Sequence, residues 1–314
     1  MKRLLIIAVA VVALTQVVRA QGNSYFDDKG AIRLETVELD EAADTLVTLF
    51  HRVDDIVWSR VVYRVIDMRY KQNYQLYFPV KETKEYRSLF RVMLDALLES
   101  PKNPEDSIHL YEASYENIRP DFAEDKILRG MDLSRRFANN EAEDGSNLNE
   151  NNLIKYDSID GSYYFDNYAY EQYVRNQIKF VIQEVYFFDK HTSRMHSQII
   201  AIAPLYALHP DNLGSATDAP METFLHSIVG WYSFKELRKA LAKQYIIPKG
   251  NDSHRVTFDE FFAKKLYSSY LLGDSNMFDR MIIDYQKYDM NLVKREQERI
   301  ETELLNFEQD LWEN

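Results

Sequence analysis

The stretch that decides the fold reads DDIVWSRVVYRVIDMR from Asp54 to Arg69 and continues as YKQNYQLYFP to Pro79. Two patterns overlap in it. Four apolar residues recur at spacings of four, four and three, which places them on one side of a helix: Val57, Val61, Val65 and Met68. The many β-branched residues favour a strand instead. Because the helical period lasts longer than an ordinary strand, we predict a helix, followed by an extended segment that ends at Pro79.

The charged and aromatic residues of this stretch allow two interpretations. Arg60 and Arg64 would lie one helical turn apart, with Asp67 three residues beyond. In the first interpretation they form a solvated face with an Arg64–Asp67 ion pair worth a few tenths of a kcal/mol. In the second they form a recognition face, because Trp, Tyr and Arg dominate interface hot spots. That face would comprise Trp58, Arg60, Tyr63 and Arg64.

The run from Asp54 to Arg69, with the YQLYFP that begins at Tyr74, resembles the gliding-motility family GldN, called PorN in relatives that only secrete. The resemblance extends over nearly the whole chain after its leader. It implies a non-catalytic periplasmic part of the type IX secretion system of Bacteroidetes. It also implies a ring formed with an outer-membrane-associated lipoprotein, GldK or PorK, and contact with the GldM or PorM motor shaft.

The first 20 residues have the pattern of a secretory signal peptide. Lys2 and Arg3 precede a short apolar run, and small residues precede the expected cleavage between Ala20 and Gln21. The apolar run is shorter than the roughly 20 residues that span a bilayer. We therefore expect export of a chain that cannot hold itself at a membrane, because the sequence has no cysteine for a lipid anchor.

Composition excludes several kinds of function. The absence of cysteine rules out disulfides and thiolate chemistry. The formal net charge is −12, and loss of the leader would make it more negative, which argues against nucleic-acid binding and favours basic partners. The seven histidines form no metal-ligand motif; the closest pair is His191 and His196. No catalytic motif is present, so we expect neither enzyme activity nor a cofactor.

We predict an α+β fold, in which several helices pack around a small antiparallel sheet. The clearest β signal is a hairpin at about residues 177–208, with Ile199–Ala203 as its most covered part. Other expected elements are a helix starting near residue 41, a helix at 83–98 capped by Thr83, a strand at 107–111, a helical stretch within 120–137, a helix at 234–241, and a helix that a capping box opens at Thr257 and Gly273 closes.

Two segments bear on domain organisation and partners. Residues 139–152 are too polar to order alone, so we expect a mobile loop within a single domain spanning 21–314. The tyrosines from Tyr163 to Tyr173 either pack on the core or form an interface, in which Tyr164 and Tyr168 are candidate partner-binding residues. They also suggest an alternative function, a periplasmic protein that binds a glycan or a peptide.

The C-terminal segment predicts a charged helix at about residues 291–312. Its apolar residues fall on one narrow seam: Val293, Ile300, Leu304, Phe307 and Leu311. Such a seam packs either on its own domain or on a partner, and the sequence does not decide between the two. We expect the partners to be the lipoprotein, the motor shaft and neighbouring copies of the chain.

Overall fold

The computed structural model describes residues 51–83, 86–99, 107–114, 116–137, 152–176, 179–205, 227–248, 255–277, 280–286 and 289–313, with Thr45 and Leu225. The expected leader with its cleavage site, the helix expected near residue 41 and all of the expected loop at 139–152 except Asn152 lie outside these residues. Asn152 itself is buried and donates from Nδ2 to the Ser134 hydroxyl at 2.9 Å.

The stretch that decides the fold is a strand and not the predicted helix. After a short 3-10 turn, η1 (Val53–Asp55), strand β1 runs from Ile56 to Asp67. The helix prediction was wrong because a spacing of four residues fits both structures: it is about one helical turn and also an even number, which keeps residues on one face of a strand. Only Met68 breaks the even spacing, and Met68 lies beyond the end of β1.

The extended segment predicted before Pro79 was also wrong, because residues 74–77 form the short helix α2 (Tyr74–Tyr77). Buried Asn73 fixes the turn that precedes this helix. Its side-chain amide donates to the carbonyl groups of Asp67 and Ser268 at 2.8 and 2.6 Å, and its side-chain oxygen accepts from the Ser268 N–H at 2.7 Å. The contacts with Ser268 span 195 residues, so local propensity could not reveal them.

The main sheet has six antiparallel strands in the order β2-β7-β6-β5-β1-β8. Its other strands are β2 (Leu110–Tyr111), β5 (Lys179–Asp189), β6 (Arg194–Leu205), β7 (Trp231–Ser233) and β8 (Tyr270–Asp274). The predicted hairpin is confirmed as β5 and β6, and its residues 199–203 lie in the sheet interior. A second sheet pairs β3 (Ile154–Asp157) with β4 (Ser162–Phe165).

Helices complete the α+β fold that the sequence predicted. They are α3 (Leu89–Glu99), α4 (Gly130–Arg136), α5 (Asn167–Asn176), α7 (Phe234–Lys243), α8 (Phe258–Ala263), α9 (Ile282–Tyr285) and α10 (Met290–Glu313), with a 3-10 turn η4 (Glu124–Lys126). The predicted strand at 107–111 is confirmed in its last two residues, and the helices expected within 120–137 and at 234–241 and 291–312 are confirmed.

Two of the predicted helix boundaries were wrong. Helix α3 begins after Ser88, whose hydroxyl accepts from the Arg91 N–H, whereas Thr83 caps only a turn by accepting from the Tyr86 N–H. Thr257 does cap α8, accepting from the Glu260 N–H at 3.2 Å. That helix ends at Ala263 because Lys265 adopts a left-handed φ of 50°. Gly273 lies in β8, so it closes no helix.

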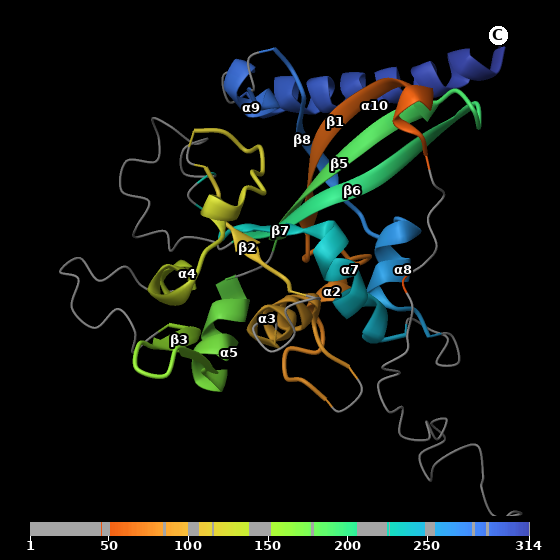
Figure 1. Ribbon diagram of the computed structural model, residues 1–314. Coiled ribbons are helices and arrows are strands. Elements are labelled where there is room, and N and C mark those ends of the chain that lie inside the picture. The colour runs from red at the N-terminus through yellow and green to blue at the C-terminus, as the bar shows by residue number, and fades with distance from the viewer. Residues whose placement is uncertain are drawn as a thin grey trace, which may run out of the picture.

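Different elements cover the two ends of one sheet face (Figure 1). Helices α3, α7 and α8 pack on the end near β7 through a large apolar cluster. Helix α10 crosses the other end, where β1, β5 and β6 extend beyond their shorter neighbours. We name this extension, residues 56–61, 185–189 and 194–199, the arm. Among the described residues, no helix is both long enough and apolar enough to span a membrane.

Candidate interaction surface

The side chains of β1 alternate between the two faces of the sheet, and α10 covers one of these faces. Val62 packs in one cluster with Ile300 and Leu304 of α10, and Trp58 borders the same cluster. Arg60 and Arg64 share this face, because residues two apart on a strand point the same way. Tyr63 points to the opposite face, where its hydroxyl accepts from Gln183 Nε2 at 3.2 Å. The structure therefore brings together three of the four residues proposed as a recognition face.

Trp58 holds α10 by ring stacking. Its ring lies 4.4 Å from that of Phe307, centroid to centroid, with 27° between the ring planes. Stacked aromatic pairs contribute about 0.5–1.5 kcal/mol beyond the area they bury. The stack fixes the position of α10 over the arm near the helix's C-terminal end.

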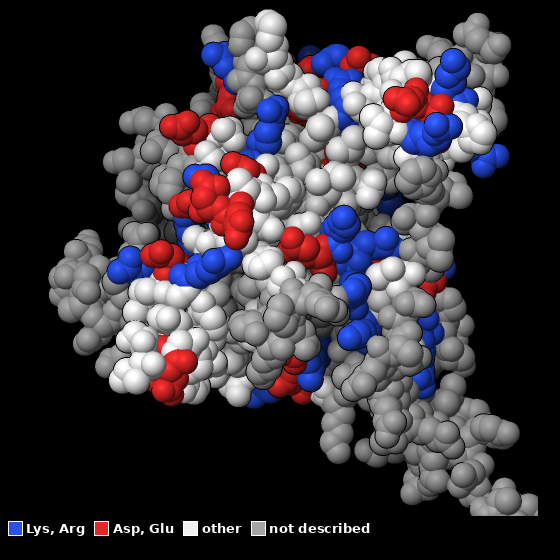
Figure 2. Space-filling view, in the orientation of Figure 1, with Lys and Arg blue, Asp and Glu red and all other residues white. Residues whose placement is uncertain are grey.

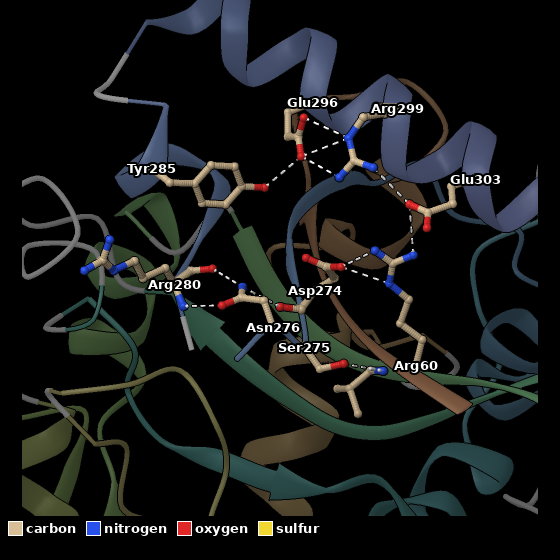
Figure 3. Close-up of polar contacts among 10 residues, drawn as sticks. Arg60, Asp274, Ser275, Asn276, Arg280, Tyr285, Glu296, Arg299 and Glu303 are labelled. Atoms are coloured by element: carbon tan, nitrogen blue, oxygen red, sulfur yellow. Dashed lines mark hydrogen bonds and ion pairs between the residues drawn. The ribbon is translucent and has the colours of Figure 1, made fainter. Parts of the chain in front are cut away.

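Arg60 joins three elements by charge (Figure 3). Its Nε and Nη2 atoms donate to Asp274 Oδ2 of β8 at 2.9 and 2.5 Å, and its Nη1 lies 3.3 Å from Glu303 Oε2 of α10. Only 17% of the Arg60 side chain is exposed. Charge-assisted hydrogen bonds are stronger and more directional than neutral ones. Arg60 therefore fixes the position of α10 along β1.

Arg64 lies in a deeper group of charges. Its Nη1 donates to Glu301 of α10 at 3.0 Å, and its Nε lies 3.5 Å from Oε2 of Glu184, which is 1% exposed. Lys265 Nζ lies 3.5 Å from the same oxygen, and the Tyr267 hydroxyl donates to the other oxygen of this carboxylate. Burial opposes the charge on Arg64, but the acidic groups around it hold its pKa above the ordinary value.

Asp67 is not the partner of Arg64, so the helical ion pair considered above does not form. The Asp67 carboxylate instead accepts from Arg69 Nε at 2.9 and 3.1 Å, and it lies 3.9 Å from Lys179 Nζ. Burial alone would raise the pKa of Asp67, but the hydrogen bonds from Arg69 keep it below the ordinary value. The strand separates Arg64 and Asp67 because residues three apart point to opposite faces.

The apolar seam of α10 packs on its own domain. Val293, Ile300 and Leu304 are buried, and they meet Val62, Leu271 and Ile282. Further along the helix, Phe307 stacks on Trp58, while the side chain of Leu311 lies outside the described part. The solvent side of α10 carries the exposed side chains of Met290, Leu292 and Leu305, which are 69%, 41% and 56% exposed. The structure thus leaves an outer face of α10 that combines charge with exposed apolar groups.

A cavity of about 420 Å³ opens between the arm and α10. Arg64, Lys265 and Glu301 contribute its charged groups, and Tyr186 and Leu305 contribute apolar surface. Lys265 Nζ lies 4.5 Å from the Tyr186 ring centroid and donates to its hydroxyl at 3.1 Å. Because these cations already have acidic or aromatic partners, the cavity has little net charge to attract a charged ligand.

The tyrosines between residues 163 and 173 divide into internal and exposed groups. The Tyr163 hydroxyl accepts from the Gly130 N–H at 2.6 Å, and the buried Tyr170 ring stacks on Phe90 at 6.2 Å. Tyr164 and Tyr168 are 51% and 75% exposed. Both candidate residues of this segment are therefore accessible, on a part of the molecule separate from α10 (Figure 1).

The surface charge is not uniform (Figure 2). On this face, Lys and Arg side chains gather over α7 and α8, and Asp and Glu side chains gather over the segment around η4. Helix α7 contributes Lys235, Lys239 and Lys243, all exposed and four residues apart, and η4 contributes exposed Glu124 and Asp125. An acidic chain can therefore present a basic stripe to a partner.

The structure is therefore that of an α+β protein. Its long C-terminal helix is held over an antiparallel arm by charge pairs and a ring stack. The family model described as "Gliding motility associated protein GldN" matches residues 51–313. Because this match covers most of the chain, the protein belongs to the GldN family, as the sequence resemblance predicted. No curated protein matches the chain.

Proposed function

We propose that this protein is a non-enzymatic structural component of the type IX secretion and gliding-motility machinery of Bacteroidetes. In this proposal it works in the periplasm, forms a ring with a GldK- or PorK-like lipoprotein and neighbouring copies of itself, and contacts a GldM- or PorM-like motor shaft. The lipoprotein holds it at the outer membrane. The observation that carries the proposal is the GldN family match over residues 51–313.

The arrangement of α10 supports an assembly role. The charge pairs and the ring stack fix the helix on the sheet, so its outer face forms a rigid surface. Rigid surfaces lose less conformational entropy on binding than mobile segments do. The exposed Leu305 sits beside the described cavity and provides an apolar anchor among charged residues. We therefore infer that partners bind the outer face of α10.

The edge of the arm supports a second contact. Strand β7 pairs with β6 only at Ala201 and Ile202, and among the described residues no strand pairs with 194–199 on that side. An unpaired strand edge can accept a strand from another chain through backbone hydrogen bonds. In a ring, this edge would have to pair with a different segment of the neighbouring copy, because two identical edges that pair with each other close a two-fold dimer.

Copurification tests the role of α10. The variant Leu305→Glu places a charge on the outer face without removing a buried group, and Ile159→Glu is the control because Ile159 is 91% exposed in a turn. We expect Leu305→Glu to reduce recovery with tagged lipoprotein or shaft by about tenfold, which corresponds to about 1.4 kcal/mol. Equal recovery of both variants would show that the outer face of α10 does not bind these partners.

Arg64→Ala is a poor test of partner binding, although Arg64 is a candidate partner-binding residue. It would leave Glu184 buried with less positive charge around it, so a loss of binding would report on the fold as well. Trp58→Ala and Arg60→Ala have the same difficulty because both residues hold α10. Substitutions at exposed positions on α10 test partner binding without disturbing the fold.

Fractionation tests the proposed location. In cells with the lipoprotein, the protein should sediment with the outer membrane, and in cells without it the protein should remain in the periplasmic fraction. Because the chain is acidic, we expect added salt to slow association with a basic partner more than it lowers the final affinity. Membrane association that persists without the lipoprotein would contradict the proposal that the lipoprotein holds the protein at the outer membrane.

The exposed Tyr164 and Tyr168 side chains support a second candidate function, the binding of a glycan or a peptide. If this function is correct, purified protein should bind a peptidoglycan fragment, and Tyr168→Ala should weaken the binding at least tenfold. If the assembly function alone is correct, the variant should change neither ligand binding nor copurification with the lipoprotein.

A further inference from the structure

Three potential metal ligands converge at the tip of the arm. His51 lies two residues before the turn η1, Asp189 ends β5, and His196 lies near the start of β6. One ligand atom from each lies within 4.8 Å of the others. His51 Nδ1 is 2.5 Å from Asp189 Oδ2, and the two imidazole centroids are 4.4 Å apart. Among the described residues, this is the one group of three potential metal ligands whose ligand atoms come this close together.

The surroundings orient these side chains. The Asp189 side chain is 3% exposed, and its Oδ1 accepts from the His191 N–H at 2.7 Å. His196 Nε2 and the Thr192 hydroxyl are 2.9 Å apart, which leaves Nδ1 of this ring as its other ligand atom. Outer hydrogen bonds of this kind orient the ligands of protein metal sites.

One aromatic ring packs against both imidazoles of the cluster. Phe187 is buried; its ring meets His51 edge-on at 5.0 Å and stacks on His196 at 5.6 Å.

We propose that His51, Asp189 and His196 bind one divalent first-row cation, with Zn²⁺ as the best fit. Two imidazole nitrogens and one carboxylate oxygen form a ligand set that suits zinc, and the fourth tetrahedral position remains for water or a group from a partner. Two ligands of a tetrahedral zinc lie about 3.3 Å apart, so His51 and Asp189 must separate by about 0.8 Å on binding. This is a small side-chain movement.

The metal would connect the chain before β1 to the turn between β5 and β6. His51 and Asp189 are 138 residues apart in the sequence, so the ion would close a long loop. The role is independent of which partner the family proposal assigns to the protein.

Metal titration of the full chain, purified without a histidine tag and treated with a chelator, tests the site. We expect one Zn²⁺ per chain by calorimetry, with a Kd below about 1 μM, and a Co²⁺ absorption spectrum typical of tetrahedral coordination. At a hundredfold excess over Kd, Zn²⁺ should raise the melting temperature by about 5 °C.

Matched variants locate the binding. His51→Gln and His196→Ala should each weaken Zn²⁺ binding at least thirtyfold, while His191→Ala should bind as the parent does, because His191 is exposed in the same turn but outside the cluster. Circular dichroism confirms that each variant is folded. Binding weaker than about 1 mM, or equal binding by all three variants, would overturn the proposal and leave a hydrogen-bonded cluster without metal.

Discussion

The two ends of the same sheet face are covered by different means. Near β7, helices α3, α7 and α8 cover the sheet with apolar side chains such as Leu237, Phe258 and Phe262, each at most 1% exposed. Over the arm, α10 adds a ring stack and charge pairs to a shorter apolar seam. Both arrangements hold helices on strands, but their physical basis differs.

The comparison shows which contacts stabilise the fold and which contacts fix the position of a helix. Apolar burial contributes about 25 cal/mol per Å² and depends little on direction, so the first end carries most of the stability. The charge pairs that reach α10 involve Glu301 and Glu303, whose side chains are 44% and 52% exposed, so solvent screens them and they add little net energy, although they restrict where the helix can lie. The α10 end therefore fixes where the helix lies more than it stabilises the chain. The following four substitutions test this comparison.

The largest effect should come from Phe262→Ala. The Phe262 ring packs against the rings of Phe234 and Tyr267, each at 5.6 Å. Truncation leaves a cavity, so we expect a loss of about 3–5 kcal/mol in the free energy of unfolding, measured with denaturant. Phe262→Leu keeps more volume and should lose less than half as much. A loss below about 1 kcal/mol would show that this cluster is not the main core.

A smaller loss should follow Glu184→Gln. This change removes the buried charge that faces Arg64 and Lys265 but keeps an acceptor for Tyr267. Because Arg64 retains Glu301, we expect a loss of about 2 kcal/mol, which is less than the roughly 3–5 kcal/mol for a buried pair that loses its only partner. Adding Arg64→Met should restore part of this stability. Additive losses in the double variant would mean that the two residues are not coupled.

The next effect should be local. Phe307→Ala removes the stack on Trp58, and we expect a loss of about 1 kcal/mol. Hydrogen exchange should accelerate in the last turns of α10, while exchange in α7 should stay as in the parent. Equal acceleration in both helices would indicate that α10 belongs to the same cooperative unit as the apolar core.

The smallest effect should come from Arg299→Ala on the outer face of α10. Arg299 is 57% exposed and hydrogen-bonds Glu296 and Glu303, so we expect a change below about 0.5 kcal/mol at pH 7. The hydrogen bond from Arg299 lowers the pKa of Glu296. Its contribution is therefore present above the ordinary glutamate pKa and disappears as pH falls through the lowered value.

Denaturation at pH 7 and at pH 3 measures the free energy of unfolding of the parent and of Arg299→Ala. The difference between the two free energies should be smaller at the lower pH. A gap that widens on acidification would show that Glu296 gains no stability from Arg299.

Patterns confined to one segment predicted structure well. The β5–β6 hairpin followed from two β-rich runs and a short polar turn, and α10 followed from its charged, periodic sequence. Predictions failed where a long-range partner decides the state. Strand β1 lies between β5 and β8, and its apolar spacing fits either state, so the choice depended on neighbours more than 100 residues away.

The candidate site was predictable in its residues but not in its contacts. Trp58, Arg60 and Arg64 were selected because their side-chain types suit interfaces, and the structure places them together under α10. Nothing in the sequence indicated that Asp274, Glu301 or Glu303 would be their partners. The ligand cluster was missed for the same reason, because His51 lies far from Asp189 and His196 in the chain.

The sequence by itself determined the family, the α+β class, the hairpin and the C-terminal helix, because each depends on residue types along a continuous segment. Only the tertiary structure decided that the stretch from Ile56 to Asp67 is a strand, that its arginines hold α10, and that two histidines meet Asp189. The physical reason is that pairing in a sheet joins residues across long loops. The free energy of those contacts exceeds the small differences in local propensity that a sequence pattern reveals.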